Sequence, residues 1–180
     1  MPQRRVRAPG ALLRQRLFGS IIPTSMVLAA VMSALHVLTL GFGLGAVFVR
    51  GLRLRDLQRA PTDARILKGL FAADGAWGAA AMSWIATGLV RAFAGIEKAS
   101  TFYTHNGFFL VKMALFLAVF LLELRPMLTF IAWRRARGVG GTPWTTAPLG
   151  TLIRINNAEV ALTVIIPFAA ALMARGLWLF

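Results

Sequence analysis

The stretch Thr104–Arg137, THNGFFLVKMALFLAVFLLELRPMLTFIAWRRAR, determines the fold class of the chain. Over residues 107–122 its only charged side chain is Lys112. A helix needs about 20 predominantly apolar residues to cross the roughly 30 Å hydrocarbon core of a bilayer. We therefore predict a membrane-spanning helix over residues 104–133, in which Pro126 marks either a kink or the effective end of the span.

The composition of the whole chain agrees with this interpretation. The 180 residues are 58% hydrophobic and 14% charged, with a mean hydropathy of +0.70. Soluble domains carry about 25% charged residues, so we expect most of this chain to lie in lipid. The chain has no cysteine, which excludes disulfides, cysteine-ligated iron–sulfur clusters and a cysteine nucleophile.

Three further apolar stretches lie over residues 23–49, 66–91 and 155–179. Together with the first they predict an all-α fold, an up-and-down, integral membrane four-helix bundle with short connections, over residues 23–180. Residues 1–22 form a basic leader with five arginines. We interpret the leader as uncleaved, because the apolar stretch that follows is about twice as long as the apolar core of a signal peptide.

The basic residues lie mostly in the connections between the apolar stretches. Four spans place both termini on one side, which carries eight basic residues, whereas the side of the first and third connections carries eleven. The positive-inside rule then predicts cytoplasmic connections over residues 50–68 and 134–154, and termini outside. The leader taken by itself favours the opposite orientation. The net charge of +14 is explained by lipid headgroups, so the expected partner is the bilayer and not nucleic acid.

Several ionisable side chains fall within the predicted spans. His105, Lys112 and Glu123 are separated by seven and eleven residues, so on a helix they share one stripe, which we expect to face the interior. Asp74 and Glu159 are further interior candidates. These carboxylates are expected to pair at the membrane face with cations, or else to form a cluster for proton uptake. The expected cations are Arg154, Arg125 and Lys68.

His36 is the most central of the polar residues, 13 residues from each end of the first predicted span. Three alternatives stay open: an interhelical hydrogen bond, an axial ligand to a haem iron, and a proton relay. Gly41, Gly43 and Gly45 follow it and suit either close helix packing or a flat cofactor. Lys112 is a candidate second group of a cofactor site, or a side chain that snorkels to the nearer membrane surface.

The sequence contains no HExxH, GxSxG or GxxxxGK[ST] motif. It therefore gives no support for hydrolase or nucleotide chemistry of the soluble type, and it names no catalytic residue. Whether the protein is an enzyme stays open.

Three strings, ADGAWGAAAMSWIATGLVRAF, THNGFFLVKMALF and NNAEVALTVIIPFAAALMARG, resemble a family of small four-helix bacterial membrane proteins known only as a domain of unknown function. The likeness covers about residues 26–176. The chain is more distantly similar to the HemJ-type protoporphyrinogen oxidases, small helical membrane proteins that bind haem b. That resemblance implies His36 and Lys112 as haem-site residues, although Leu110 stands where the family has a second histidine.

These observations predict a multi-pass protein of the bacterial inner membrane. The resemblance implies haem-b-linked redox or tetrapyrrole chemistry at His36 and Lys112. The alternative is a non-catalytic accessory or scaffold subunit that packs against a membrane-protein partner, or against a second copy of itself, through the small residues of the second span. A carrier of protons or small solutes is a third class, but the sequence contains no inverted repeat.

Overall fold

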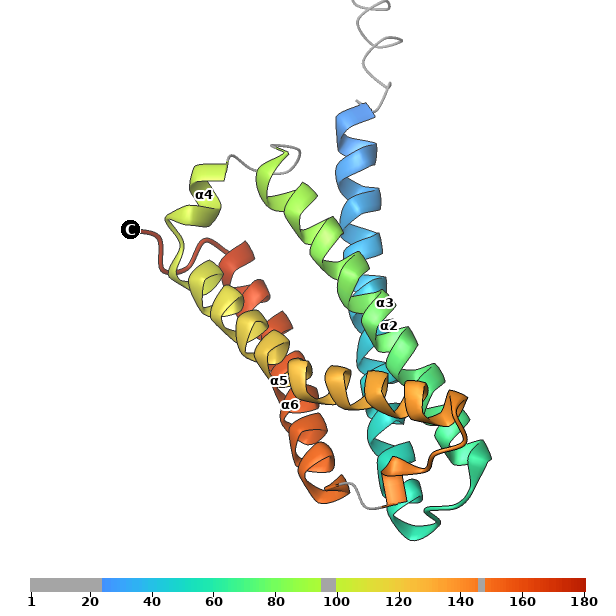
Figure 1. The fold of residues 1–180 in the computed structure, drawn as a ribbon. Helices are drawn as coiled ribbons and strands as arrows, with labels where there is room; N and C mark the ends of the chain where they lie inside the picture. Colours follow the sequence, from blue (N-terminus) through green and yellow to red (C-terminus); the bar gives the residue numbers. More distant parts are fainter. Residues whose placement is uncertain (1–23, 95–99, 146–147) are drawn as a thin grey trace, which may run out of the picture.

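The computed structural model describes residues 24–94, 100–145 and 148–180. The basic leader, and Glu97 and Lys98 in the second connection, lie outside the described residues. The described part is helical and contains no β-strand, so the all-α class is confirmed. Its elements, drawn in Figure 1, are α2 (Thr24–Arg59), α3 (Ala64–Phe93), α4 (Ser100–Thr104), α5 (Gly107–Gly138), η1 (Pro143–Thr145) and α6 (Leu149–Ala174).

Three of the described helices are long and apolar enough to cross a membrane. They are Met26–Arg59 within α2, Gly107–Gly138 and Leu149–Ala174. Helix α3 coincides with the remaining predicted span and has 30 residues. It is not one of those three candidate spans, and its middle contains glycine, serine and tryptophan together with Asp74.

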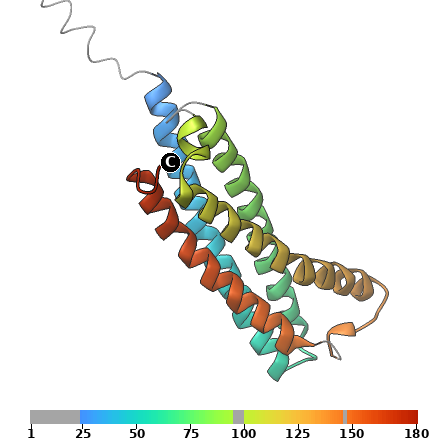
Figure 2. The ribbon, with the colours of Figure 1, turned by 90° about the vertical axis from the view of Figure 1, so that its left-hand side faces the viewer.

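The long helices alternate in direction along the chain (Figures 1 and 2). Helices α2 and α3 pack against each other, α5 packs against α6, and α6 also contacts α2. The connection between α2 and α3 is only residues 60–63, and Trp144 of η1 closes it by donating from Nε1 to the Pro61 carbonyl at 3.0 Å. At the opposite end the C-terminal segment is held against the start of α5, where the Gly107 amide donates to the Trp178 carbonyl at 2.9 Å.

Helix boundaries differ from the predicted spans where side chains cap the backbone. Asn106 is the N-cap of α5, and its side chain accepts a hydrogen bond from the Phe109 amide at 3.2 Å. The helix therefore begins at Gly107 rather than at residue 104, and His105 precedes it. Helix α2 continues to Arg59, so the prediction that Arg50 belongs to a connection is wrong.

Pro126 lies inside α5, which continues to Gly138. Of the two predicted alternatives the structure shows the kink: α5 bends at mid-length in Figures 1 and 2, and its second half crosses toward α2 and α3. A proline within a helix removes one hydrogen bond and its ring clashes with the carbonyl four residues earlier, which bends the helix. The bend brings Phe130 and Trp133 into a buried apolar cluster with leucines of α2, α3 and α6.

Candidate functional site

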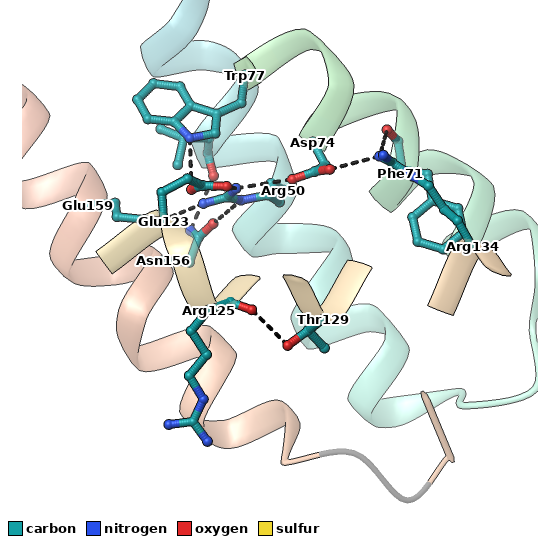
Figure 3. A network of polar contacts seen from close by, with 11 residues as sticks. Arg50, Phe71, Asp74, Trp77, Glu123, Arg125, Thr129, Arg134, Asn156 and Glu159 are labelled. Carbon is teal, nitrogen blue, oxygen red and sulfur yellow. Dashed lines mark hydrogen bonds and ion pairs between the residues drawn. The ribbon is translucent and has the colours of Figure 1, made fainter. Parts of the chain in front are cut away.

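Arg50 of α2 is the centre of a buried network of polar side chains (Figure 3). Its Nε donates to Asn156 Oδ1 at 2.9 Å. Its Nη1 donates to Asp74 Oδ1 at 3.3 Å and to both carboxylate oxygens of Glu123 at 2.9 Å. Its Nη2 donates to Oε2 of Glu159. Helices α2, α3, α5 and α6 thus each contribute to one cluster.

A second set of contacts holds these partners in place. Trp77 Nε1 donates to Glu123 Oε2 at 3.0 Å. Arg134 Nη2 donates to Asp74 Oδ2 at 2.7 Å and to the Phe71 carbonyl at 3.2 Å. The Arg134 side chain is 41% exposed, whereas Asp74 is 12% exposed. The kink at Pro126 is what turns the second half of α5 toward α3, where Arg134 reaches Asp74.

The small residue Gly51 leaves room for Asn156, which lies between Arg50 and the backbone of α2. Besides accepting from Arg50, Asn156 donates from Nδ2 to the Val47 carbonyl at 3.1 Å. A Cβ atom at Gly51 would lie 2.5 Å from Asn156 Nδ2, closer than side chains approach. Arg50 therefore supplies the cation, and its neighbour Gly51 leaves the space for the Asn156 amide that orients the Arg50 side chain.

The carboxylates predicted to lie in the interior are the ones that meet here, because Asp74, Glu123 and Glu159 all bind Arg50. The prediction that these carboxylates pair with Arg154, Arg125 or Lys68 at the membrane face was wrong, because their ion-pair partners are Arg50 and Arg134. Arg125, for example, points away from the cluster in Figure 3, and its carbonyl accepts from Thr129 Oγ1 at 2.8 Å.

Sequence reasoning missed Arg50, Asn156 and Trp77. A signal was present: three of the six acidic residues lie in predicted spans, and buried carboxylates require a cation. Arg50 directly follows the first apolar stretch, so the sequence pattern assigns it to a connection and not to the interior.

His105 does not belong to an interior stripe. It precedes α5, its side chain is exposed, and its Nδ1 lies 3.1 Å from the Thr101 carbonyl. Its ring packs beside Phe180 at the C-terminus. The stripe expectation failed at this residue because helical spacing applies only within a helix, and α5 begins at Gly107.

His36 and Lys112 line one cavity, although they come from α2 and α5. The cavity has a volume of about 200 Å³ and is otherwise lined mainly by apolar side chains, among them Trp84, Phe109 and Phe116. Lys112 Nζ lies 5.6 Å from the centre of the Phe109 ring. The cavity therefore presents one cation and one imidazole in an apolar surface.

Both ring nitrogens of His36 take part in hydrogen bonds to α3. Trp84 Nε1 donates to His36 Nε2 at 2.9 Å, and His36 Nδ1 lies 2.8 Å from Thr87 Oγ1. Because Thr87 Oγ1 donates its own proton to the Ser83 carbonyl at 2.8 Å, Nδ1 is the donor to Thr87. Gly88 permits this approach, since a Cβ there would lie 3.3 Å from His36 Cε1.

These contacts do not fit a haem iron. The lone pair on Nε2 that would bind iron already accepts the Trp84 proton, and Nδ1 carries a proton. The cavity volume of about 200 Å³ is also below the roughly 300–1,000 Å³ of pockets for drug-sized ligands. Gly43 packs against Ala80 and Trp77 rather than beside open space. The haem site therefore stays a prediction.

The comparisons with known proteins identify the family but no activity. No curated protein and no solved structure matches the chain. A family model described as "Predicted membrane protein (DUF2214)" matches residues 28–177, which include the arginine cluster and both sides of the cavity. The chain is therefore a membrane protein of this family, whose function is unknown.

Proposed function

We propose that this protein is a multi-pass protein of the bacterial cytoplasmic membrane whose four long helices all cross the bilayer as an up-and-down bundle. Helix α3 has 30 residues, about 45 Å at 1.5 Å per residue, and follows α2 after a connection of residues 60–63. It therefore returns along α2 through the same layer. Its one internal carboxylate, Asp74, is paired with Arg50 and Arg134, which supports a buried position. The bacterial origin rests on the resemblance.

The orientation follows from the basic residues at the two ends. Arg50 is removed from the count because it is buried in the cluster, which leaves ten basic residues on the side of the first and third connections against eight. We expect reporter fusions inserted at residues 61 and 140 to give a cytoplasmic signal. A fusion after Phe180 should report from the opposite side. A periplasmic signal at 61 or 140 would contradict the orientation and would make the leader arginines the stronger determinant.

The function that the geometry supports best is the binding of an amphiphilic molecule in the cavity between His36 and Lys112. The observation that carries it is the meeting of these two side chains, 76 positions apart in sequence, in a surface that is otherwise mainly apolar. Ligand pockets typically combine an apolar wall with a few polar groups that fix orientation. Among the residues that line the cavity, Lys112 is the one with a charged side chain, and the His36 ring is bonded to Trp84 and Thr87.

The charge of Lys112 defines the class of ligand. It lies five residues into α5, about 7.5 Å from the helix start by the rise per residue. An amphiphile with a carboxylate or carbonyl oxygen would place that oxygen at Lys112 and its apolar part along Trp84 and Phe116. A cavity of about 200 Å³ accommodates only part of such a molecule, so the remainder extends into the lipid.

Quenching of tryptophan fluorescence by a brominated long-chain fatty acid tests this function, because Trp84 lines the cavity. The purified protein in detergent should show saturable quenching. The Lys112→Met variant should bind about 10- to 150-fold more weakly, the equivalent of one charge-assisted hydrogen bond of roughly 1.5–3 kcal/mol. The matched control is Lys68→Met, which removes an exposed lysine of α3 outside the cavity and should leave the affinity unchanged.

Two outcomes would contradict ligand binding at this place. One is quenching that persists in Trp84→Phe to the same extent, and the other is equal affinity in the Lys112 and Lys68 variants. The same purified protein tests the haem prediction. A b-type Soret band that is lost in His36→Ala would establish haem, and would mean that the Trp84–His36 hydrogen bond opens when haem binds.

A scaffold function is the second candidate, and a second groove, lined by residues of α2 and α3, favours it. The groove has a volume of about 510 Å³ and is lined largely by small residues. Small residues allow helices in membranes to approach closely, as in interfaces with another helix. The lining includes Gly41, Gly45, Ala72, Ala73 and Ala76. If the folded protein binds no amphiphile in the quenching experiment, we expect the scaffold function in place of ligand binding.

A further inference from the structure

The arginine cluster contains more carboxylates than cations. Asp74, Glu123 and Glu159 surround Arg50, and Arg134 adds a second guanidinium through Asp74. Three negative and two positive charges leave a net charge of −1 if every group is ionised. A net charge is costly to bury, and charges in protein interiors are normally balanced.

The surroundings of Glu159 distinguish it from the other two carboxylates. Glu123 accepts from Arg50 and Trp77, and Asp74 accepts from Arg50 and Arg134, whereas the donor to Glu159 is Arg50. The Glu159 side chain is 0% exposed, while those of Asp74 and Glu123 are 12% and 21% exposed. Glu159 is therefore the most deeply buried of the three and the one with fewest donors.

Two buried oxygens on α6 have no hydrogen-bond partner among the described residues. They are Oε1 of Glu159 and Oγ1 of Thr163. Residues four apart on a helix are neighbours on one face, so these two oxygens lie on the same buried side of α6. Buried polar atoms are normally paired, so each of these two oxygens retains the capacity for a further hydrogen bond.

We propose that the cluster is a proton-binding site that holds one exchangeable proton on Glu159 Oε1. The proton comes from water and converts the Glu159 carboxylate into the neutral acid, and its release restores the carboxylate. The bound proton brings the sum of charges over Arg50, Arg134 and the three carboxyl groups to zero. Thr163 Oγ1 accepts a hydrogen bond from the new O–H group.

The proposed proton site is separate from the cavity, but it lies on the same face of α6 as a residue that lines the cavity. Glu159, Thr163 and Ile166 are all buried on α6, and Ile166 lines the cavity. Seven residues of helix span about 10.5 Å, so the proton lies within about that rise of the cavity wall. The inference rests on the charges and contacts of the cluster and holds whether or not the cavity binds an amphiphile.

Infrared spectroscopy of the purified protein in lipid nanodiscs tests the proposal. At neutral pH the wild-type protein should show the carbonyl stretching band of one protonated carboxylic acid, and the band should shift on exchange from H₂O to D₂O. Glu159→Gln should remove the band. The matched control, Asp56→Asn, removes a carboxyl group that is 39% exposed and pairs with Arg53 outside the cluster, and it should leave the band unchanged.

Two further variants test separately whether the net charge of the cluster requires a bound proton and whether that proton lies on Glu159. Glu123→Gln leaves two carboxylates and two guanidiniums, so it should also remove the band although Glu159 is present. Thr163→Val removes the acceptor and should move the band to higher frequency without removing it. No band in the wild type, or a band that persists in Glu123→Gln, would overturn the proton site. An unshifted band in Thr163→Val would overturn the position of the proton on Glu159.

Discussion

Replacing Arg50 with methionine should lower the free energy of unfolding by about 3–5 kcal/mol, the range measured when one partner of a buried ion pair is removed. Methionine fills a similar space, so the loss comes from charge and hydrogen bonding and not from a cavity. Without Arg50, the carboxylates of Asp74, Glu123 and Glu159 face one another with Arg134 as the cation that is left. The Asn156 oxygen also loses its donor.

Chemical unfolding in detergent micelles, followed by circular dichroism, measures this effect. Arg53→Met is the matched control, because Arg53 is on the same helix, is 45% exposed and contacts Asp56 at 3.5 Å. Its removal should change the free energy of unfolding by less than about 0.5 kcal/mol. Equal effects of the two substitutions would show that the cluster does not stabilise the fold.

A compensated variant identifies the physical origin of the loss. Adding Glu123→Gln and Glu159→Gln to Arg50→Met replaces the two carboxyl groups that lose Arg50 as their ion-pair partner, while keeping the shapes of the side chains. Because the remaining carboxylate, Asp74, keeps its contact with Arg134 at 2.7 Å, we expect most of the lost stability to return. If the triple variant is as unstable as Arg50→Met, hydrogen bonds of the guanidinium, and not charge balance, are what the fold requires.

Replacing Gly51 with alanine should lower the free energy of unfolding by about 2–4 kcal/mol. The added methyl would lie 2.5 Å from Asn156 Nδ2, so Asn156 has to move. Its movement weakens two buried hydrogen bonds, the one from Arg50 and the one to the Val47 carbonyl. Overpacking alone costs about 1–3 kcal/mol, and a buried polar group that loses its partner costs a similar amount.

Replacing Gly45, on the same helix, with alanine should instead raise the free energy of unfolding. A Cβ atom there would meet no other atom within 4 Å, so Gly45→Ala relieves the helix of a glycine without a steric cost. The variant should be more stable by about 0.5–1 kcal/mol. Melting curves of both variants in one detergent compare the two positions directly. Destabilisation of equal size at Gly45 and Gly51 would mean that backbone flexibility, and not the position of Asn156, determines the effect.

Much of the helical framework could be predicted from residue order. The apolar stretches predicted helices at α2, α3, α5 and α6, because a 20-residue apolar segment can bury its backbone polar groups only as a helix in lipid. The helix ends were less predictable. Arg50 resembles the end of a span in sequence, yet α2 continues to Arg59, and the Arg50 guanidinium is neutralised by carboxylates of other helices.

The partners of Arg50 show why the site was harder to predict than the helices. Its bonds to Asp74, Glu123 and Glu159 span 24, 73 and 109 positions of sequence. Local spacing places each carboxylate on a helix but contains no information on which cation faces it. The nearest cations in sequence or in membrane depth, such as Arg125 and Lys68, were therefore the natural but incorrect choice.

The sequence by itself determined that the chain is a helical membrane protein and that Asp74, Glu123 and Glu159 are candidates for its interior, because hydropathy and helical spacing are local properties. Only the tertiary structure decided that Arg50 pairs those carboxylates, and that His36 and Lys112 line one cavity. It also showed that both nitrogens of His36 bind α3. The physical reason is that burial and ionic pairing depend on how four helices pack and on the bend at Pro126, which no single stretch of sequence encodes.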